Sequence, residues 1–187
     1  MKFSDIKTFK DFLTSFFILE VRKEFDFYPT PISIVKEIAK RWSFEGNKVW
    51  EPCAGDGRMS EELERLGCEV VSTDISNGED FFTYSAALAD VIITNPPFKC
   101  IRQFIDHAFD IGVRQMALVC PERLWACKKG RLQFNTFKPT RFANMDWRED
   151  YLQKGGSPDR ALAVAMWDEP KAVNCHYEIW TQLGAYD

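Results

Sequence analysis

A short apolar strand that ends in a proline pair constrains this sequence more than any other feature. Residues 91–94 are apolar or β-branched, the pattern of a strand that is buried on both faces. Asn-Pro-Pro-Phe follows at residues 95–98. Proline lacks the N–H that a sheet ladder needs and holds the preceding residue extended, so the strand must stop in a stiff loop. In an open α/β sheet, ligands bind at the edge where the carboxyl ends of the strands lie.

A glycine-containing turn lies upstream of this strand. Residues 48–57 predict a strand and a turn, followed by a helix. Gly55 and Gly57 permit backbone conformations and a close approach that a Cβ would block, so a ligand can lie against bare main chain at a helix N-terminus. The turn lacks the third glycine of the dinucleotide fingerprint. Glu51 and Asp56 make it acidic, which suits a cationic ligand better than a pyrophosphate.

Two acidic positions follow the turn. Asp74 ends a predicted strand over residues 69–74, roughly twenty residues after the glycines, where an acid can accept hydrogen bonds from ribose hydroxyls. Asp80 and Phe81 then form an acid–aromatic pair in the next loop. By themselves, a loop acid and a core phenylalanine would be ordinary features.

These segments together resemble one family. Asn-Pro-Pro-Phe resembles the catalytic motif of S-adenosylmethionine-dependent methyltransferases that modify an amino or amide nitrogen beside a planar group. The turn is similar to the Pro-x-x-Gly-x-Gly turn that holds the cofactor in those enzymes. Tyr28, Thr30 and Pro31 resemble the Tyr-x-Thr-Pro segment of amino-methylating DNA methyltransferases. The order of the motifs matches adenine-N6 DNA methyltransferases, and the resemblance covers about residues 25–121, more faintly up to Trp167.

The resemblance implies a fold class and a domain organisation. We expect an α/β fold, a single Rossmann-like class I methyltransferase domain whose mostly parallel sheet ends in a late antiparallel hairpin. The domain would span residues 1–187, with an N-terminal helical extension over residues 1–24 and possible target-recognition loops over 121–160. Local patterns add a helix capped by Thr30 and a helix over residues 122–129.

The resemblance also implies a cofactor, S-adenosylmethionine, and a set of site residues. The cofactor-binding residues would be Tyr28, Thr30, Pro31, Glu51, Pro52, Ala54, Gly55, Asp56, Gly57, Asp74, Ile75, Asp80, Phe81 and Asn95. The catalytic residues would be Asn95, Pro96, Pro97 and Phe98. The Asn95 side-chain oxygen and the Pro96 carbonyl would accept hydrogen bonds from the target amine, while Phe98 would stack on the target base. No metal-ligand spacing is present, so no metal is expected.

Charge is distributed unevenly along the chain, whose net charge is −4. Six basic residues and one acidic residue lie between Pro121 and Arg141. A segment of this kind can bind phosphates, although a solvated helix face explains it equally well. The candidates for nucleic-acid contacts are Arg123, Lys128, Lys129 and Arg131.

Several alternatives stay open at this level. DNA is favoured over RNA as the nucleic-acid partner by the Tyr-x-Thr-Pro segment, but an RNA methyltransferase acting on guanine N2 or adenine N6 uses the same tetrapeptide. A protein-glutamine methyltransferase and a non-catalytic binding module on the same fold are further alternatives. The absence of a long apolar run predicts no membrane association, and six scattered cysteines favour reduced thiols in a cytoplasmic protein. The oligomeric state is not predicted.

Overall fold

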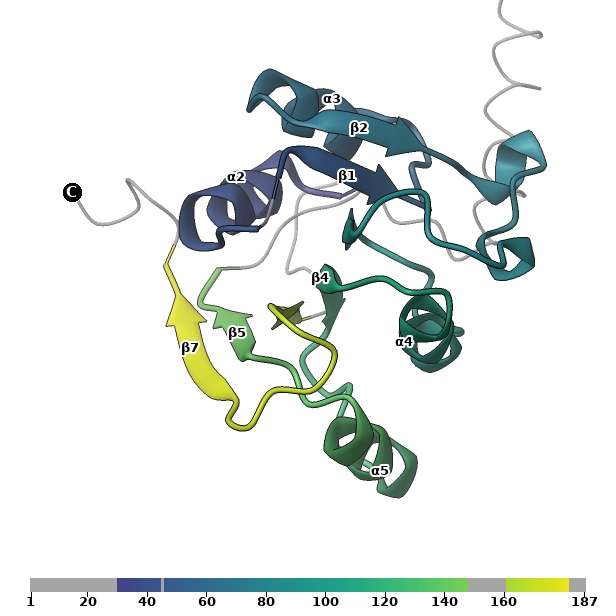
Figure 1. Ribbon diagram of the computed structural model, residues 1–187. Helices are drawn as coiled ribbons and strands as arrows, with labels where there is room; N and C mark the ends of the chain where they lie inside the picture. Colours follow the sequence, from purple (N-terminus) through teal and green to yellow (C-terminus); the bar gives the residue numbers. More distant parts are fainter. Residues whose placement is uncertain (1–29, 45, 148–160, 182–187) are drawn as a thin grey trace, which may run out of the picture.

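The computed structural model describes residues 30–44, 46–147 and 161–181 (Figure 1). Tyr28, the expected N-terminal extension over residues 1–24 and the loop 148–160 lie outside these ranges. The helices are α2 (Ile32–Arg41), α3 (Arg58–Arg65), α4 (Ile101–Asp110) and α5 (Lys128–Thr136), with short 3₁₀ turns η1 (Ile75–Asn77) and η2 (Phe81–Thr83). The strands are β1 (Lys48–Glu51), β2 (Glu69–Ser72), β3 (Val91–Thr94), β4 (Gln115–Pro121), β5 (Arg141–Met145), β6 (Leu162–Trp167) and β7 (His176–Trp180).

The strands form one mixed sheet in the order β2-β1-β3-β4-β6-β5-β7. Strands β1 to β4 pair in parallel, β6 runs antiparallel to both β4 and β5, and β7 pairs in parallel with β5. The expected class of fold, a mostly parallel sheet with a late antiparallel hairpin, is confirmed. The chain leaves β1 toward β2 on one side and returns to β3 on the other, so the strand order reverses between β1 and β3. That position is where open α/β sheets bind ligands.

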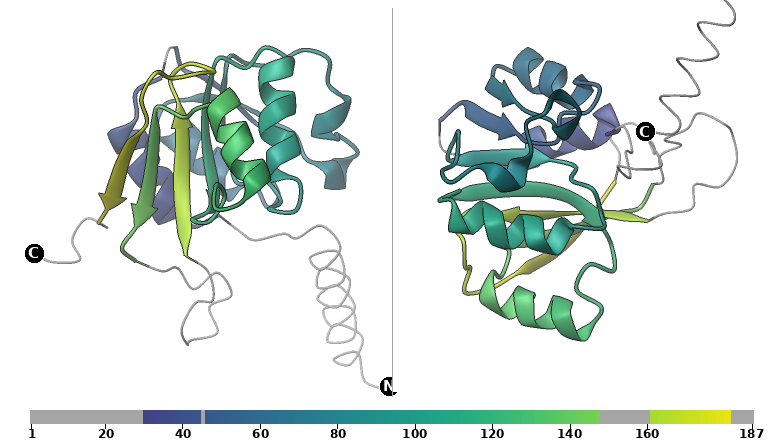
Figure 2. Two further views of the ribbon diagram at one scale, coloured as in Figure 1. Left: turned by 90° about the horizontal axis from the view of Figure 1, so that it is seen from below. Right: turned by 90° about the vertical axis from the view of Figure 1, so that its right-hand side faces the viewer.

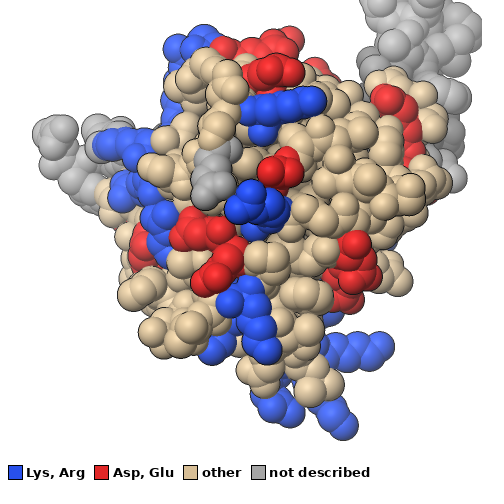
Figure 3. All heavy atoms as spheres, viewed as in Figure 1, with Lys and Arg blue, Asp and Glu red and all other residues tan. Residues whose placement is uncertain are grey.

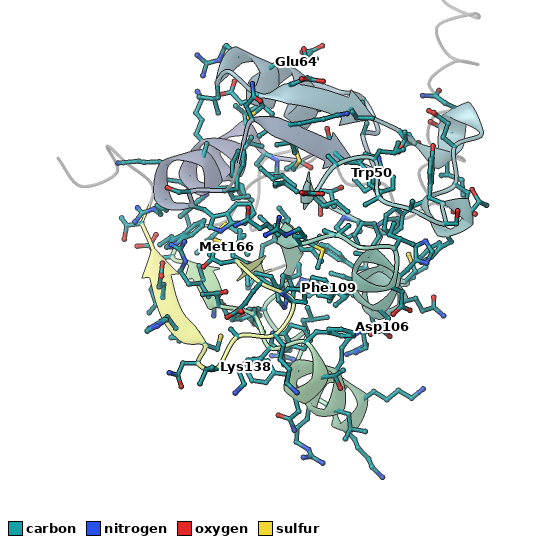
Figure 4. The ribbon with its side chains drawn as sticks, in the orientation of Figure 1. Trp50, Glu64, Asp106, Phe109, Lys138 and Met166 are labelled. Atoms are coloured by element: carbon teal, nitrogen blue, oxygen red, sulfur yellow. The ribbon has the colours of Figure 1, made fainter. Side chains whose placement is uncertain are left out.

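Helices cover both faces of the sheet, α4 and α5 on one side and α2 and α3 on the other (Figure 2). Alternation along the central strands supplies the two cores, because neighbouring residues point to opposite faces. Trp50 on β1 packs in the core beneath α4, and Met166 on β6 packs in the core beneath α2 (Figure 4). Both side chains are fully buried. The central strands β3, β4 and β6 are therefore buried on both faces, as the sequence pattern of residues 91–94 predicts.

Strand β7 is attached to helix α2 by side chains from distant parts of the sequence. The Arg41 guanidinium lies over the Trp180 ring at 5.5 Å and donates to the Thr181 carbonyl at 3.3 Å. Arg141 on β5 donates to the Arg41 carbonyl at 2.7 Å, and the Trp42 indole donates to Asp168 at 2.6 Å. These contacts position an edge strand that hydrophobic alternation did not predict as a strand.

Two local predictions were wrong. Thr30 does not cap α2, because the helix begins at Ile32 and the capping position is Pro31, which makes no side-chain hydrogen bond. The helix expected over residues 122–129 is a turn up to Cys127, and α5 begins only at Lys128. Cys127 has extended backbone, and its sulfur accepts a hydrogen bond from the Gly130 N–H at 3.2 Å, so the helix cannot start earlier. Within the described ranges, no helix is long and apolar enough to span a membrane.

Candidate active site

The glycine turn connects β1 to α3 and is shaped by two left-handed residues. Gly55 has a φ of 58° and Gly57 a φ of 82°. L-amino acids rarely adopt these conformations, which explains the glycines at both positions. An added Cβ at Gly57 would meet no atom within 4 Å, so the conformation alone selects glycine there. Because Gly57 precedes α3 without any side-chain cap, the first N–H groups of that helix face the turn.

Asp74 lies beside this turn, at the end of β2. One carboxylate oxygen accepts a hydrogen bond from the Gly55 N–H at 2.8 Å, and the other accepts one from the Ser76 N–H at 2.8 Å. An ionised carboxylate offers about four acceptor positions, so about two remain for a ligand. The carboxylate therefore fixes the turn and can still receive two hydroxyl donors. Ile75, the next residue, is 46% exposed and forms an apolar surface beside the carboxylate.

Glu51 ends β1 beneath the turn and is 1% exposed. Its carboxyl group is hydrogen-bonded to the Ser60 hydroxyl on α3, which lies 2.6 Å from the Ser72 hydroxyl on β2. Burial raises the pKa of Glu51 to about 8, and the negative charges of Asp56 and Asp74 contribute in the same direction. Asp56 itself forms an ion pair with Arg58 at 2.7 Å. Glu51 is thus a buried acid in an acidic part of the site.

Cys53 lies within the glycine turn, and sequence reasoning did not single it out as a candidate site residue. Burial raises the pKa of its thiol well above the ordinary value, and the neighbouring charge of Asp74 adds to the effect. The thiol therefore stays neutral, and the partly buried side chain packs against the core beneath α4. Its position inside the predicted turn was the signal available in the sequence, but nothing there showed that its side chain points inward.

The Asn-Pro-Pro-Phe loop begins directly where β3 ends, one strand away from the glycine turn. Asn95 is half-buried and Pro96 is buried. The Pro97 carbonyl accepts a hydrogen bond from the Cys100 N–H at 3.1 Å, and the chain then continues into α4. The half-buried Phe98 packs against residues of both cores.

The acid–aromatic pair divides between surface and core. Asp80 caps η2 by accepting from the Phe82 N–H at 3.0 Å. Phe81 is 4% exposed and stacks on Phe104 with ring centroids 4.0 Å apart. The next residue, Phe82, is 41% exposed, so of the two neighbouring phenylalanine rings it is Phe82 that reaches the surface. The sequence could not distinguish the two phenylalanines, and a contact of Phe81 with a ligand stays a prediction.

The remaining predicted cofactor residues that the structure describes are Thr30, Pro31, Pro52 and Ala54. Thr30 is buried, and Pro31 precedes α2. Pro52 is buried directly after β1, and Ala54 donates through its N–H to the Thr73 carbonyl at 3.1 Å. This bond holds the turn against the end of β2. No cluster of three or more potential metal ligands occurs within the described ranges.

The four predicted basic residues surround the start of α5. Arg123, Lys128, Lys129 and Arg131 are all exposed. Lys and Arg side chains project from the end of the molecule where α5 lies (Figure 3). Because α5 follows β4, its first turn lies toward the carboxyl edge of the sheet, the edge that carries the Asn-Pro-Pro-Phe loop. The two lysines occupy that first turn.

Comparison with known proteins identifies the fold. No family model matches the sequence, and no curated protein matches it. Among solved structures, a Listeria monocytogenes protein described as a class I S-adenosylmethionine-dependent methyltransferase superposes with a TM-score of 0.57 at 12% identity. The match covers 84% of this chain and 67% of that one. This chain has the class I methyltransferase fold.

Two further solved structures with this fold carry different descriptions. A Pyrococcus horikoshii protein described as an RNA methyltransferase gives a TM-score of 0.58 at 17% identity, covering 76% of this chain and 87% of that one. The modification subunit of a type I restriction enzyme from Vibrio vulnificus gives 0.50 at 15% identity, covering 91% of this chain and 51% of that one. This chain therefore spans about half of the restriction subunit.

Proposed function

We propose that this protein binds S-adenosylmethionine and transfers its methyl group to the N6 amine of adenine in DNA. The observation that carries the proposal is the position of the Asn-Pro-Pro-Phe loop on β3, next to the glycine turn on β1, at the point where the strand order reverses. This arrangement would bring one side-chain acceptor, the Asn95 oxygen, and one backbone acceptor, the Pro96 carbonyl, close to a turn that can hold a ligand against its main chain. The class I fold supports the proposal.

The residues of the turn fit the cofactor. Gly55 and Gly57 leave the main chain bare, and Asp74 retains acceptor positions for the two ribose hydroxyls. The exposed Ile75 and Phe82 offer apolar surfaces for the adenine ring. Glu51 and Asp74 make the turn acidic, in keeping with a ligand that carries positive charge. Bound there, the cofactor would supply a methyl group activated by a positively charged sulfur.

The protein's contribution to methyl transfer would be to hold the target amine. The lone pair of an aromatic amine is delocalised into the ring, so the amine is a weak nucleophile. Acceptors at the Asn95 side chain and the Pro96 carbonyl would take its two N–H groups and favour a pyramidal nitrogen. Such preorganised partners are typically worth about 2–4 kcal/mol each. Phe98 would stack on the base, and the proton would leave only after the nitrogen has attacked.

The nucleic acid would lie along the carboxyl edge and reach the start of α5. Lys128 and Lys129 add positive charge where the helix dipole is already positive, an arrangement that favours an anion as the neighbour. Together with Arg123 and Arg131 they would contact phosphates, which position a nucleic acid without reading its sequence. A base in a duplex would have to be flipped out to reach Asn95, at a cost of a few kcal/mol.

The test is transfer of labelled methyl groups from S-adenosylmethionine to unmethylated duplex DNA, single-stranded DNA and total RNA, followed by nucleoside analysis. N6-methyladenine in DNA is the expected product. The Asn95→Ala variant serves as the matched negative control, because it removes one acceptor and leaves the glycine turn intact. Label in neither nucleic acid would contradict the proposal and direct attention to protein substrates or to a binding module without activity.

RNA is the second candidate substrate, and a specific comparison favours it. The Pyrococcus horikoshii protein described as an RNA methyltransferase covers 76% of this chain, and this chain covers most of that protein in return. Label recovered as N6-methyladenine or N2-methylguanine in RNA, with none in DNA, would make RNA the substrate. The basic start of α5 would then be the surface that binds RNA.

A further inference from the structure

Glu51 is a buried acid to which the proposed methyl transfer assigns no proton-transfer step. It lies under the glycine turn with 1% of its surface exposed. No described basic side chain forms an ion pair with it. Burying an unpaired carboxylate is costly, so a group in this position favours its neutral, protonated form.

The charged groups around Glu51 reinforce this preference. Asp56 in the turn and Asp74 at the end of β2 both act on it as negative charges. The nearby guanidinium of Arg58 is engaged by Asp56 in an ion pair at 2.7 Å. The thiol of Cys53, the other titratable neighbour, is held neutral by burial. Among the described residues, no positive charge is therefore placed to balance an ionised Glu51.

A chain of hydroxyl groups connects this carboxyl group to the surface. Glu51 is hydrogen-bonded to the Ser60 hydroxyl, and Ser60 lies 2.6 Å from the Ser72 hydroxyl. Ser60 is 6% exposed, whereas Ser72 is exposed at the end of β2. Because a hydroxyl group can both donate and accept, the hydrogen bonds along this series of groups can point in either direction. A neutral Glu51 can donate outward along it, and an ionised Glu51 can accept from it.

We infer that Glu51 holds a proton while the site is empty and releases it through Ser60 and Ser72 to solvent when a positively charged ligand binds. The inference rests on the proposed function, because S-adenosylmethionine is the cation in question. The O–H bond of the carboxyl group breaks, the proton passes to water, and the charge of the bound ligand replaces it. Glu51 thereby makes the site selective for cationic ligands over neutral ones of similar shape.

Calorimetric titration of the full chain with S-adenosylmethionine at pH 7, in two buffers of different ionisation enthalpy, counts the protons released. The wild-type protein is expected to release about one proton per ligand, and Glu51→Gln none. Glu64→Gln, which changes an exposed acid on helix α3 (Figure 4), should release as many protons as the wild type. Adenosine, which carries no cation, should bind without proton release.

The affinity for S-adenosylmethionine should depend on pH, because binding and release of the Glu51 proton are coupled. Wild-type affinity for S-adenosylmethionine is expected to rise by up to about tenfold per pH unit from pH 6 and to level off above pH 8. The affinity of Glu51→Gln should stay flat over this range. Binding by the wild type with no proton release, or with the same pH dependence as Glu51→Gln, would overturn the inference and leave the cofactor proposal standing. Failure to bind at any pH would overturn both.

Two measurements examine the proton and its route. The infrared spectrum of the ligand-free wild type at pH 7, minus that of Glu51→Gln, should contain the carbonyl band of a protonated carboxyl group. A difference spectrum without this band would overturn the inference. Stopped-flow mixing with an indicator dye follows proton release in time. In Ser60→Ala the release should lag behind ligand binding, whereas Ser85→Ala, an exposed control, should not differ from wild type. Unchanged release in Ser60→Ala would exclude the serine route.

Discussion

The carboxylate of Asp74 accepts a hydrogen bond from the backbone N–H of Gly55 at 2.8 Å. This bond joins the end of β2 to the glycine turn that follows β1, so the acid that would receive the ribose also fixes the main chain that would face the rest of the ligand. The two parts of the proposed cofactor site are therefore mechanically coupled. A change at Asp74 should affect both.

Asp74→Ala should weaken S-adenosylmethionine binding without altering the preferred nucleic acid. Hydrogen bonds to a charged group are worth about 1.5–3 kcal/mol, so the dissociation constant should rise roughly tenfold to a hundredfold. Calorimetric titration measures the change. Asp90→Ala, which removes an exposed carboxylate immediately before β3, is the control. An unchanged dissociation constant for Asp74→Ala would remove this residue from the site.

Asn95→Ala should nearly abolish turnover and leave cofactor affinity within a few-fold of wild type. The variant loses one acceptor for the target amine, a loss of about 2–4 kcal/mol in the transition state, or roughly thirtyfold to a thousandfold in rate. Single-turnover methyl transfer and calorimetric titration separate the two effects. If cofactor binding were lost together with turnover, Asn95 would belong to the cofactor site and not to the target site.

Glu51→Gln should alter the pH dependence of stability. The folded-state pKa of Glu51 is about 8, above its ordinary value of 4.5, so the folded state retains a proton that the unfolded chain has lost. The contribution of Glu51 to the free energy of unfolding is fully present below pH 4.5. It decreases by up to about 1.4 kcal/mol per pH unit as the pH rises toward 8. Urea unfolding from pH 5 to 9 should show the variant gaining stability relative to wild type. Parallel curves would contradict the prediction.

Gly130→Ala should destabilise the protein through the start of α5. A Cβ there would lie 2.7 Å from the Leu124 carbonyl oxygen and 2.9 Å from the Trp125 Cα, both backbone atoms that cannot turn away. Forced overpacking of this kind costs about 1–3 kcal/mol, which thermal unfolding can measure. Asn135→Ala, at an exposed position of the same helix, should have little effect. Equal melting temperatures for the two variants would show that α5 shifts freely.

Replacing Lys128 and Lys129 together by alanine should weaken nucleic-acid binding equally for all sequences. Each lost phosphate contact should reduce the slope of log affinity against log salt by about 0.9 for duplex DNA. Fluorescence anisotropy across a salt series measures both quantities. The control replaces Lys36 and Lys40 on α2, an equal change in net charge at another exposed surface. If both double variants behaved alike, the effect would be one of net charge alone.

The sequence predicted the parts of this fold that local physics determines. Residues 91–94 are buried on both faces, so their pattern is continuous, and the prolines end the strand wherever it lies. The two glycines permit the left-handed conformations that the turn adopts. Strand β7 was not predicted, because Tyr177 and Ile179 are exposed and its place depends on Arg41, far away in the sequence.

Part of the geometry of the candidate site was predictable in the same way. The order of the acidic and glycine positions along the chain placed Asp74 beside Gly55, because parallel strands bring their carboxyl ends to one edge. The inward-facing groups were not predictable in this way. Whether Phe81 or Phe82 faces the core, and whether Ser60 faces Glu51, depends on the packing of η2 and α3, which no local pattern encodes.

The bond between Arg41 and Thr181 closes a loop of 140 residues. Closing such a loop has an entropy cost that only a preformed partner can offset, so β7 cannot join the sheet until β5 and the end of α2 are in place. The order of assembly follows from this geometry. During synthesis on a ribosome, the strands that carry the glycine turn and the Asn-Pro-Pro-Phe loop would be complete well before β7 pairs with β5 at the edge of the sheet.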